Sequence, residues 1–367
     1  MTNNQKEYIL IGGYPAKGIN QHPGGQVTAT RLLVEYAKAN NIKLNIIDTS
    51  QNSFPIPSII SRLKQAKKRI IKLNKLLKEK NIDGVIIFSS TGFSFYEKIF
   101  MSLITKKYNV QSFLFIRSGH FIDLNMSNKV MKIINKFLLK IPTFIGAQGN
   151  KWVDFYQNMN VNLSKVKLIY NWIKIKKENT YQTSDDQVVF LYAGWMVQKK
   201  GVVDLFDVIQ KNNDLKSYTF RFAGEGTLFE SLKERKEKYN LDNIELLGWV
   251  DEKNMLDEYK KADIFILPSH AEGFPNAVLE ALNCRLPIIS TNVGGIPDSI
   301  IDGYNGYIFE PNDQKVMYEK IKKLGESSEK RIEFSQNSNA ILMKHHDFNK
   351  NCQHVFDSFK NKQGNNK

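Results

Sequence analysis

The apolar residues of this chain form short unbroken runs that alternate with longer stretches in which apolar positions recur at helical spacing. A short apolar run predicts a buried strand, and spacings of three and four predict a helix with one apolar face. The predicted strands are residues 7–12, 43–48, 83–90, 112–119, 141–148, 166–172, 188–194, 218–224, 243–248, 262–268 and 287–291. The predicted helices are residues 26–40, 59–80, 128–140, 227–239, 251–261 and 275–283, with two more that begin at 151 and 202. Strands that alternate with helices indicate an α/β fold with parallel sheets.

The helix predicted at 59–80 combines an apolar stripe with many positive charges. Nine Lys/Arg lie between Arg62 and Lys80, and the apolar stripe consists of Ile59, Leu63, Ala66, Ile70, Leu73 and Leu77. Two interpretations stay open: a solvated outer face above a core-facing stripe, or a basic amphipathic helix that lies on anionic lipid headgroups. The helix predicted at 128–140 is also basic and apolar-striped.

Residues 175–187 are polar and lack apolar periodicity, which is typical of a linker. A chain of 367 residues suits two domains. We therefore predict a first domain at 1–174, the linker at 175–187, a second domain at 188–345, and a C-terminal tail at 346–367. The chain after about Glu326 is predicted to be helical at first and then polar and frayed.

The excess of positive over negative charge lies entirely in the first half of the chain. The net charge is +15, yet residues 1–174 hold 26 Lys/Arg against 8 Asp/Glu and the remainder holds 26 against 29. This asymmetry suggests that the two halves meet different partners. The sequence contains no unbroken apolar run of 18 residues and no recognisable signal peptide, so we expect a cytoplasmic protein without a membrane-spanning helix.

The segment from Ser269 to Ile300 holds the strongest chemical signal. Glu272 precedes a Gly-Phe-Pro turn after a buried strand, a helix follows at once, and Glu280 lies eight positions after Glu272 on that helix. Ligands of open α/β sheets bind at the carboxyl ends of strands, and helix N-termini suit phosphates. Glu272 could accept hydrogen bonds from sugar hydroxyls, and Glu280 could bind a ribose diol.

Five segments, in order, resemble glycosyltransferase family 4, the retaining GT-B enzymes with a Glu-x7-Glu motif. They cover nearly all of 188–312 and are residues 193–205, 221–232, 243–269, 269–300 and 293–309. The resemblance implies two doubly wound Rossmann-like domains that face a central cleft, with the acceptor bound by the first and a nucleotide sugar by the second. Trp195 departs from the family, which has an arginine there.

The resemblance also implies roles for individual residues. His120, after the strand 112–119, and Glu272 become catalytic candidates, and Lys200 would contact the donor diphosphate as a flexible point charge. The implied donor-binding residues are Gly24, Gly25, Lys200, Gly224, Val250, Glu272, Gly273, Phe274, Asn276, Ala277, Val278 and Glu280.

The implied activity is transfer of a hexosyl unit from a nucleoside diphosphate sugar to an acceptor hydroxyl, with retention at the anomeric carbon. The expected donor is a UDP-sugar, with no cofactor and no metal, and Lys200 and backbone N–H groups in place of a metal ion. The expected acceptor is a lipid-linked saccharide. The reaction would then belong to the synthesis of a cell-surface polysaccharide, namely capsule, exopolysaccharide, lipopolysaccharide or teichoic acid. The basic first half would lie on the anionic inner face of the cell membrane.

Several alternatives are weighed against this activity. A nucleotide-sugar epimerase of GT-B architecture would also bind the donor. A catalytically silent relative would bind it too, and Trp195 in place of the usual arginine supports this second alternative. No nucleic-acid partner is expected, because the basic residues alternate with aliphatic residues and not with stacking aromatics.

Overall fold

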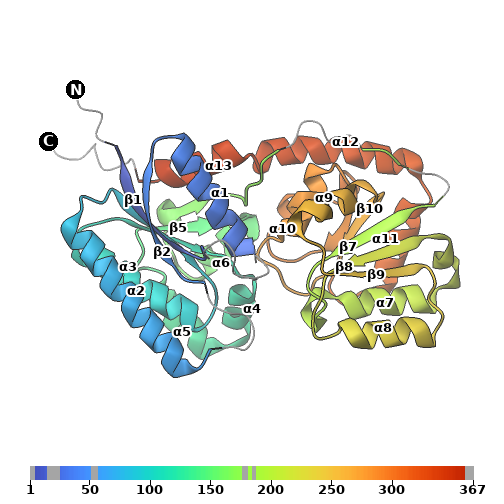
Figure 1. The fold of residues 1–367 in the computed structure, drawn as a ribbon, viewed down its shortest axis with the longest axis horizontal. Helices are drawn as coiled ribbons and strands as arrows, with labels where there is room; N and C mark the ends of the chain where they lie inside the picture. Colours follow the sequence, from blue (N-terminus) through green and yellow to red (C-terminus); the bar gives the residue numbers. More distant parts are fainter. Residues whose placement is uncertain (1–4, 15–24, 51–56, 176–180, 184–186, 360–367) are drawn as a thin grey trace. The chain divides into compact units, whose positions relative to one another are not determined.

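A computed structural model describes residues 5–14, 25–50, 57–175, 181–183 and 187–359 (Figure 1). The chain divides into two compact units. The first unit comprises residues 1–172 together with 348–367, and the second comprises residues 173–347. The described residues form one six-stranded parallel sheet in each unit, so the predicted α/β class and the two-sheet organisation are confirmed.

The sheet of the first unit has the order β2-β1-β3-β4-β5-β6. Its strands are β1 (Glu7–Gly12), β2 (Lys43–Asp48), β3 (Gly84–Ser89), β4 (Ser112–Ile116), β5 (Phe144–Ala147) and β6 (Val166–Leu168). The central strands β3 and β4 are buried along their whole length, as expected for a parallel sheet covered on both faces. The chain leaves β1 toward β2 and leaves β3 toward β4, so the direction of winding changes between β1 and β3.

Helices cover both faces of this first sheet. One core cluster joins the sheet to α1 (Gly25–Ala39) and α13 (Phe348–Asp357). The cluster on the other face includes residues of α2 (Ile59–Glu79), α3 (Phe93–Lys107), α4 (His120–Ser127) and α6 (Asn150–Asn158). Between α4 and α6 lies α5 (Lys129–Leu138), and η1 (Leu163–Lys165) precedes β6. Among the described residues, no helix is both long and apolar enough to cross a membrane.

The prediction of a frayed C-terminal tail is wrong for residues 348–357. They form α13, whose Cys352, Val355 and Phe356 are buried against the first sheet. The Phe356 and Tyr8 rings lie 5.1 Å apart, edge to face. Aromatic burial of this kind ties the end of the chain to its first strand. The chain therefore passes between the units twice, after Trp172 and after Asp347, and much of the predicted linker, 176–180 and 184–186, lies outside the described residues.

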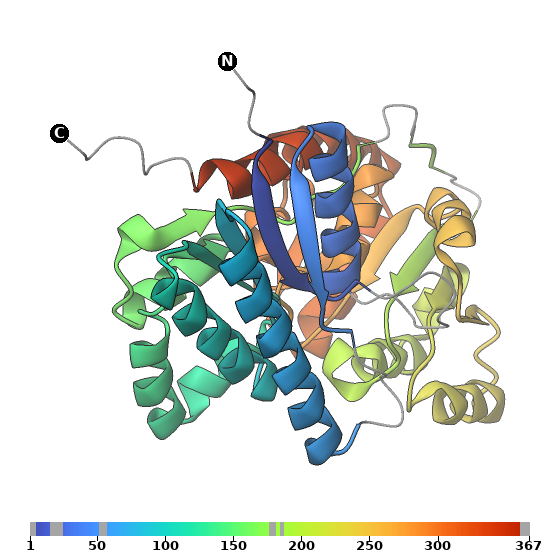
Figure 2. The ribbon, with the colours of Figure 1, turned by 60° about the vertical axis from the view of Figure 1, so that its left-hand side comes forward.

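The predicted core stripe of α2 is only partly buried. Ala66, Leu73 and Leu77 are buried, but Ile59 is 72% and Leu63 is 53% exposed. The 21 residues of α2 span about 31 Å, whereas the six-residue strands β1 and β2 span about 20 Å. The first turns of α2 therefore extend past the carboxyl ends of these strands, as Figure 2 shows.

The second unit has the strand order β12-β11-β10-β7-β8-β9. Its strands are β7 (Val189–Ala193), β8 (Thr219–Ala223), β9 (Ile244–Gly248), β10 (Ile264–Leu267), β11 (Ile288–Thr291) and β12 (Gly306–Phe309). Its helices are η2 (Gln198–Lys200), α7 (Val202–Lys211), η3 (Asn213–Ser217), α8 (Phe229–Lys238), α9 (Glu252–Lys260), α10 (Asn276–Asn283), η4 (Ile296–Asp298), α11 (Gln314–Gly325) and α12 (Ser328–His345). Winding runs outward from β7 in one direction and from β10 in the other, so the switch point lies between these two neighbouring strands.

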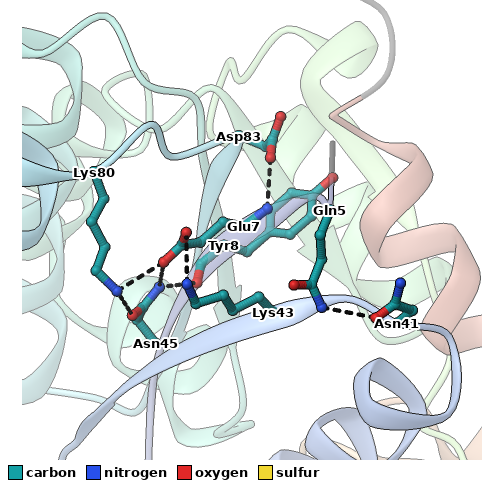
Figure 3. A network of polar contacts seen from close by, with 8 residues as sticks. All are labelled: Gln5, Glu7, Tyr8, Asn41, Lys43, Asn45, Lys80 and Asp83. Carbon is teal, nitrogen blue, oxygen red and sulfur yellow. Dashed lines mark hydrogen bonds and ion pairs between the residues drawn. The ribbon is translucent and has the colours of Figure 1, made fainter. Parts of the chain in front are cut away.

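A network of polar side chains lies at the amino edge of the first sheet, where β1 and β2 begin (Figure 3). The Glu7 carboxylate accepts hydrogen bonds from Lys80 Nζ and Asn45 Nδ2, both at 2.8 Å, and Lys43 lies 3.3 Å away. The Glu7 backbone N–H donates to Asp83. The hydrogen bond from Lys80, followed by that from Asn45, lowers the pKa of Glu7 to about 2. This network joins the starts of β1 and β2 to the residues before β3.

Candidate functional site

The loops after β7 and β10 bring a lysine and a glutamate together at the switch point of the second sheet. Lys200 Nζ lies 2.5 Å from Glu272 Oε1, and Ser269 Oγ donates to the same oxygen at 2.8 Å. Both charged side chains are mostly buried, at 18% and 10% exposure. In doubly wound sheets, ligands bind at the carboxyl ends of the strands at this point. A positive and a negative group are therefore held where a ligand is expected.

Gly201 fixes Lys200 against the end of β10. Gly201 has φ +67°, and a Cβ atom added there would lie 1.9 Å from the carbonyl oxygen of Pro268. Only glycine combines this left-handed conformation with so close a backbone approach. The His270 N–H donates to the Lys199 carbonyl at 2.9 Å, and His270 Nε2 lies 2.6 Å from Asp204. The loop after β10 is thus tied to the turn that carries Lys200.

The loop after β11 supports the glutamate from the other side. Gly294 has φ +56°, and an added Cβ atom would lie 2.2 Å from the Glu272 carbonyl oxygen. The Gly295 N–H donates to the Gly273 carbonyl at 2.7 Å. Three loops, after β7, β10 and β11, therefore pack backbone against backbone around Lys200 and Glu272.

The N-terminus of α10 follows Glu272 directly. Its cap residue is Pro275, and no side chain caps it. Asn276 and Ala277 are partly exposed, whereas Phe274 and Val278 are buried in the core. Helix N-termini carry unpaired N–H groups and a positive dipole end that favour anions. Asn276 and Ala277 are therefore placed to meet a ligand, and Phe274 and Val278 are placed to support the turn.

Glu280 lies deeper on α10 and is bonded to a buried tyrosine. The Tyr259 hydroxyl donates to Glu280 Oε2 at 2.9 Å. Burial raises the pKa of Glu280 to about 7, although the bond from Tyr259 opposes this. The carboxyl group is thus held in a desolvated position where hydroxyl donors from a ligand would favour its charged form.

The turns after β8 and β9 complete this edge of the sheet. Gly224 has φ +146°, and an added Cβ atom would lie 1.9 Å from the Gly194 carbonyl oxygen. Val250 precedes α9 and is partly buried against the core. Trp195 and Trp249 are 36% and 40% exposed, and their ring centroids are 6.2 Å apart. The two indole rings pack against each other at the surface of the second unit.

The remaining candidates belong to the first unit. His120 is exposed and is the first residue of α4, four positions after β4 ends at Ile116. Gly25 begins α1, which follows β1 at the switch point of the first sheet. Gly24 lies outside the described residues. The donor-site candidates of the second unit thus come together around one sheet edge, and His120 and Gly25 lie at the carboxyl edge of the other sheet.

Four structural features of this site were not predicted individually: the hydroxyl of Ser269, the contact of His270 Nε2 with Asp204, the hydroxyl of Tyr259, and the Gly294-Gly295 turn. The Gly-Gly pair and the Ser-His pair are visible in the sequence next to the predicted motif. Their roles depend on which loops pack together, and local patterns do not give that information.

Comparison with known families gives a match in the second unit. Residues 174–340 match the family described as "Glycosyl transferases group 1". The matched range nearly coincides with the second unit, residues 173–347. The family match therefore lies within the second unit.

Three relatives match parts of the chain. An uncharacterized glycosyltransferase of Methanocaldococcus jannaschii is 34% identical over 48% of this chain and 48% of its own. The capsular polysaccharide biosynthesis glycosyltransferase CapM of Staphylococcus aureus is 28% identical over 60% of each chain. The UDP-Gal:alpha-D-GlcNAc-diphosphoundecaprenol alpha-1,3-galactosyltransferase of Escherichia coli is 26% identical over 73% of each chain. The chain thus spans about half the length of the first of these relatives.

A solved structure covers both units. Sucrose-phosphate synthase from Thermosynechococcus elongatus superposes with a TM-score of 0.80 at 14% identity, over 97% of this chain and 98% of its own. At this identity the likeness shows the fold. The fold is GT-B, two doubly wound α/β domains, as predicted.

Proposed function

We propose, from the match of its second unit to glycosyl transferases group 1, that this protein transfers a hexosyl unit from a UDP-sugar to an acceptor hydroxyl with retention of anomeric configuration. The single observation that carries the proposal is the Lys200–Glu272 pair at the switch point of the second sheet. The two side chains of an ion pair at a ligand-binding edge can separate and bind a ligand instead. The cation then binds an anionic group of the ligand, and the carboxylate binds its hydroxyl groups. A nucleoside diphosphate sugar offers both.

The proposed reaction places charge stabilisation on Lys200 and α10. The bond between the anomeric carbon and the diphosphate oxygen breaks, and a bond from that carbon to the acceptor oxygen forms on the same face. The acceptor proton passes to an oxygen of the leaving phosphate. Lys200 Nζ leaves Glu272 for the diphosphate, whose charge grows as the bond breaks, and the N–H groups at the start of α10 add to this stabilisation. Trp195 carries no charge, so Lys200 is the main side-chain cation of the proposal.

The two glutamates take separate roles in this proposal. Glu272, released from Lys200, accepts hydrogen bonds from the sugar hydroxyls and orients the sugar. Glu280 accepts hydrogen bonds from the ribose diol, which replace the water that burial removes. His120 is proposed to lie near the transferred sugar. No metal ion takes part in this scheme.

A lipid-linked saccharide is the acceptor class that we propose. The E. coli relative with the widest coverage among the three is named for an acceptor on diphosphoundecaprenol, and CapM is named for capsular polysaccharide. The first 174 residues carry a net charge of +18, which suits an anionic surface. We therefore place the protein in the cytoplasm, at the inner face of the cell membrane, in cell-surface polysaccharide synthesis.

A transfer assay tests this proposal. The full chain is incubated with UDP-, GDP-, ADP- and CMP-sugars, with undecaprenyl-diphosphate-linked saccharides as acceptors, in the presence and absence of EDTA. We expect a UDP-sugar to yield a lipid-linked product with an α-linkage from an α-donor, equally with EDTA. Conversion of the donor sugar without an acceptor would instead identify an epimerase, and nucleotide binding without any turnover would identify a silent relative.

A further inference from the structure

The helix α5 turns its apolar side outward. Val130, Ile133, Ile134 and Phe137 recur at spacings of three and four and therefore lie on one side of the helix; we call these four residues the α5 face. Their exposed fractions are 66%, 59%, 46% and 64%. Within the described residues, none of the four packs against a core cluster. Helices of globular proteins ordinarily bury such a stripe.

The inward side of α5 carries a buried asparagine beside Leu138, which packs against the core. Asn135 is 2% exposed and donates through Nδ2 to Asn125 Oδ1 at 2.9 Å. Asn125 is itself buried and donates to the Phe121 carbonyl at 2.7 Å. The hydrogen bond between these two buried asparagines joins α5 to α4 and so fixes the orientation of α5. The outward direction of its apolar face is therefore specified by the fold.

Two further helices of the first unit, α2 and α3, also carry exposed apolar side chains. On α2, Ile59, Ile60 and Leu63 are exposed. On α3, Phe100 and Leu103 are also exposed. Residues of α2 and α3 belong to the core cluster on one face of the first sheet. Phe121, which precedes α5 in the chain, and Leu139, which follows it, belong to the same cluster. Exposed apolar side chains thus recur on helices that cover the same face of the first sheet.

Positive charge surrounds these side chains. The region 59–140 contains 17 Lys/Arg and 4 Asp/Glu. Lys129, Lys132 and Lys136 lie on α5 itself and Lys140 follows it, without an acidic residue from 129 to 140. Lys140 Nζ lies 5.5 Å from the centre of the Phe137 ring. Long lysine stems can lie along apolar surface while their ammonium groups reach outward.

We propose that the α5 face inserts shallowly into an anionic lipid surface, with the flanking lysines on the headgroup phosphates. A lipid surface offers acyl chains for four apolar side chains and negative charge for the lysines at once. A second copy of the chain would instead bring two lysine-rich surfaces together and is disfavoured by like-charge repulsion. The inference rests on the proposed function in one respect: a lipid-linked acceptor would bring the enzyme to such a surface.

Co-sedimentation with vesicles tests the proposal directly. The full chain is mixed with vesicles of equimolar phosphatidylglycerol and phosphatidylcholine, or of phosphatidylcholine alone. We expect binding to the anionic vesicles only, weakened by salt. The double variant Ile133→Ser/Phe137→Ser should bind at least about tenfold more weakly, because two large apolar side chains no longer enter the lipid. The triple variant Lys129→Gln/Lys136→Gln/Lys140→Gln should lose the salt-sensitive part of the binding.

A matched control comes from the second unit. Ile332 and Met343 on α12 are 45% and 47% exposed, and the variant Ile332→Ser/Met343→Ser removes the same kind of surface without touching α5. This variant should bind vesicles like the native chain. Equal weakening of both double variants, or failure of the native chain to bind anionic vesicles, would overturn the proposal. So would a native dimer that dissociates on the Ile133→Ser/Phe137→Ser change, since the α5 face would then be covered by a second copy.

The same samples separate this inference from the proposed function. Thermal stabilisation by UDP reports on the second unit and should be equal in the native chain and all vesicle variants. Vesicle binding without any stabilisation by UDP would contradict the proposed function and leave the α5 face as a membrane contact. Stabilisation by UDP without vesicle binding would contradict the α5 proposal alone.

Discussion

Each of the two units contains a lysine–glutamate pair of similar geometry. One pair lies at the amino edge of its sheet and the other at the carboxyl edge. Lys80 lies 2.8 Å from Glu7 at the amino edge of the first sheet, and Lys200 lies 2.5 Å from Glu272 at the carboxyl edge of the second. Parallel sheets bind ligands at their carboxyl edge. Distance and burial alone do not distinguish the two pairs; their place in the topology does. The first pair is interpreted as structural and the second as a ligand site.

The backbone around the two pairs supports this distinction. Around Lys200–Glu272, glycines at 201 and 294 allow loops to touch main chain to main chain. Around Lys80–Glu7 the partners are side chains, chiefly Asn45 and Lys43 (Figure 3). Closely packed loops hold reactive groups in place, which preorganised charge stabilisation requires. The following predictions test the distinction, from the largest expected effect to the smallest.

Substitution of Lys200 should have the largest effect on activity. Lys200→Met removes the proposed cation for the leaving diphosphate, and we expect the transfer rate to fall by about 10²–10³. Lys80→Met is the matched control, because it removes a lysine from the other pair, and its transfer rate should stay within about twofold of the native rate. Initial rates under saturating donor measure both. Equal losses in the two variants would remove the distinction between the edges.

Gly201 should be the most sensitive position for stability. In Gly201→Ala, the added methyl group meets the Pro268 carbonyl in a left-handed backbone conformation, and we expect a loss of about 3 kcal/mol or more in the free energy of unfolding. Gly303 has φ +75° with no atom near the added Cβ, so Gly303→Ala should cost only about 1 kcal/mol. Urea unfolding measures both, and similar losses would show that the contact with β10 is unimportant.

Glu280 should make stability fall as pH rises. Burial raises its pKa from 4.5 to about 7 in the folded protein, so the folded state binds the proton more tightly than the unfolded state between these values. The free energy of unfolding should therefore decrease from about pH 4.5 to pH 7, by at most about 3 kcal/mol from this group. Glu280→Gln, which does not titrate, should remove this part of the decrease. An identical pH profile in the variant would contradict the desolvated carboxyl group.

The smallest effect is expected at the amino edge of the first sheet. Lys80→Met breaks a partly exposed pair, and such pairs contribute about 1 kcal/mol or less. The loss should shrink at high salt, because the remaining attraction is screened. Urea unfolding at low and high salt measures this, and a loss of several kcal/mol would mean that the network in Figure 3 is a main support of the first unit.

Much of the fold could be predicted from the sequence because parallel strands are local apolar runs. All the predicted strands of both sheets are present, and β12 is added to them. The order of the strands within each sheet, and with it the switch points, comes from the structure. The role of α13 could not be predicted, since the contact of Phe356 with Tyr8 joins residues from the two ends of the chain. The orientation of α5 could not be predicted either. A helical stripe such as that of α5 has the same spacing whether it faces a core or a membrane.

The candidate site was predicted in outline. The motif around Glu272 and Glu280 and the position of Lys200 are visible in the sequence, and the structure brings Lys200 to Glu272 across 72 positions of the chain. The supporting contacts were not visible, because Ser269 and Gly294 act through loops that meet only in the folded sheet. Short-range patterns reveal the residue types of a site, and long-range packing decides their neighbours.

Nucleotide binding tests the central claim most directly, that the switch point of the second sheet is a UDP-sugar site. The thermal stability of the native chain and of Glu280→Ala is measured with UDP, GDP, ADP and CMP. A ligand at 100 times its dissociation constant adds about 2.7 kcal/mol of stability. We predict that UDP stabilises the native chain and stabilises Glu280→Ala much less. Absence of stabilisation by any of the four nucleotides, or equal stabilisation of both proteins by UDP, would contradict the assignment.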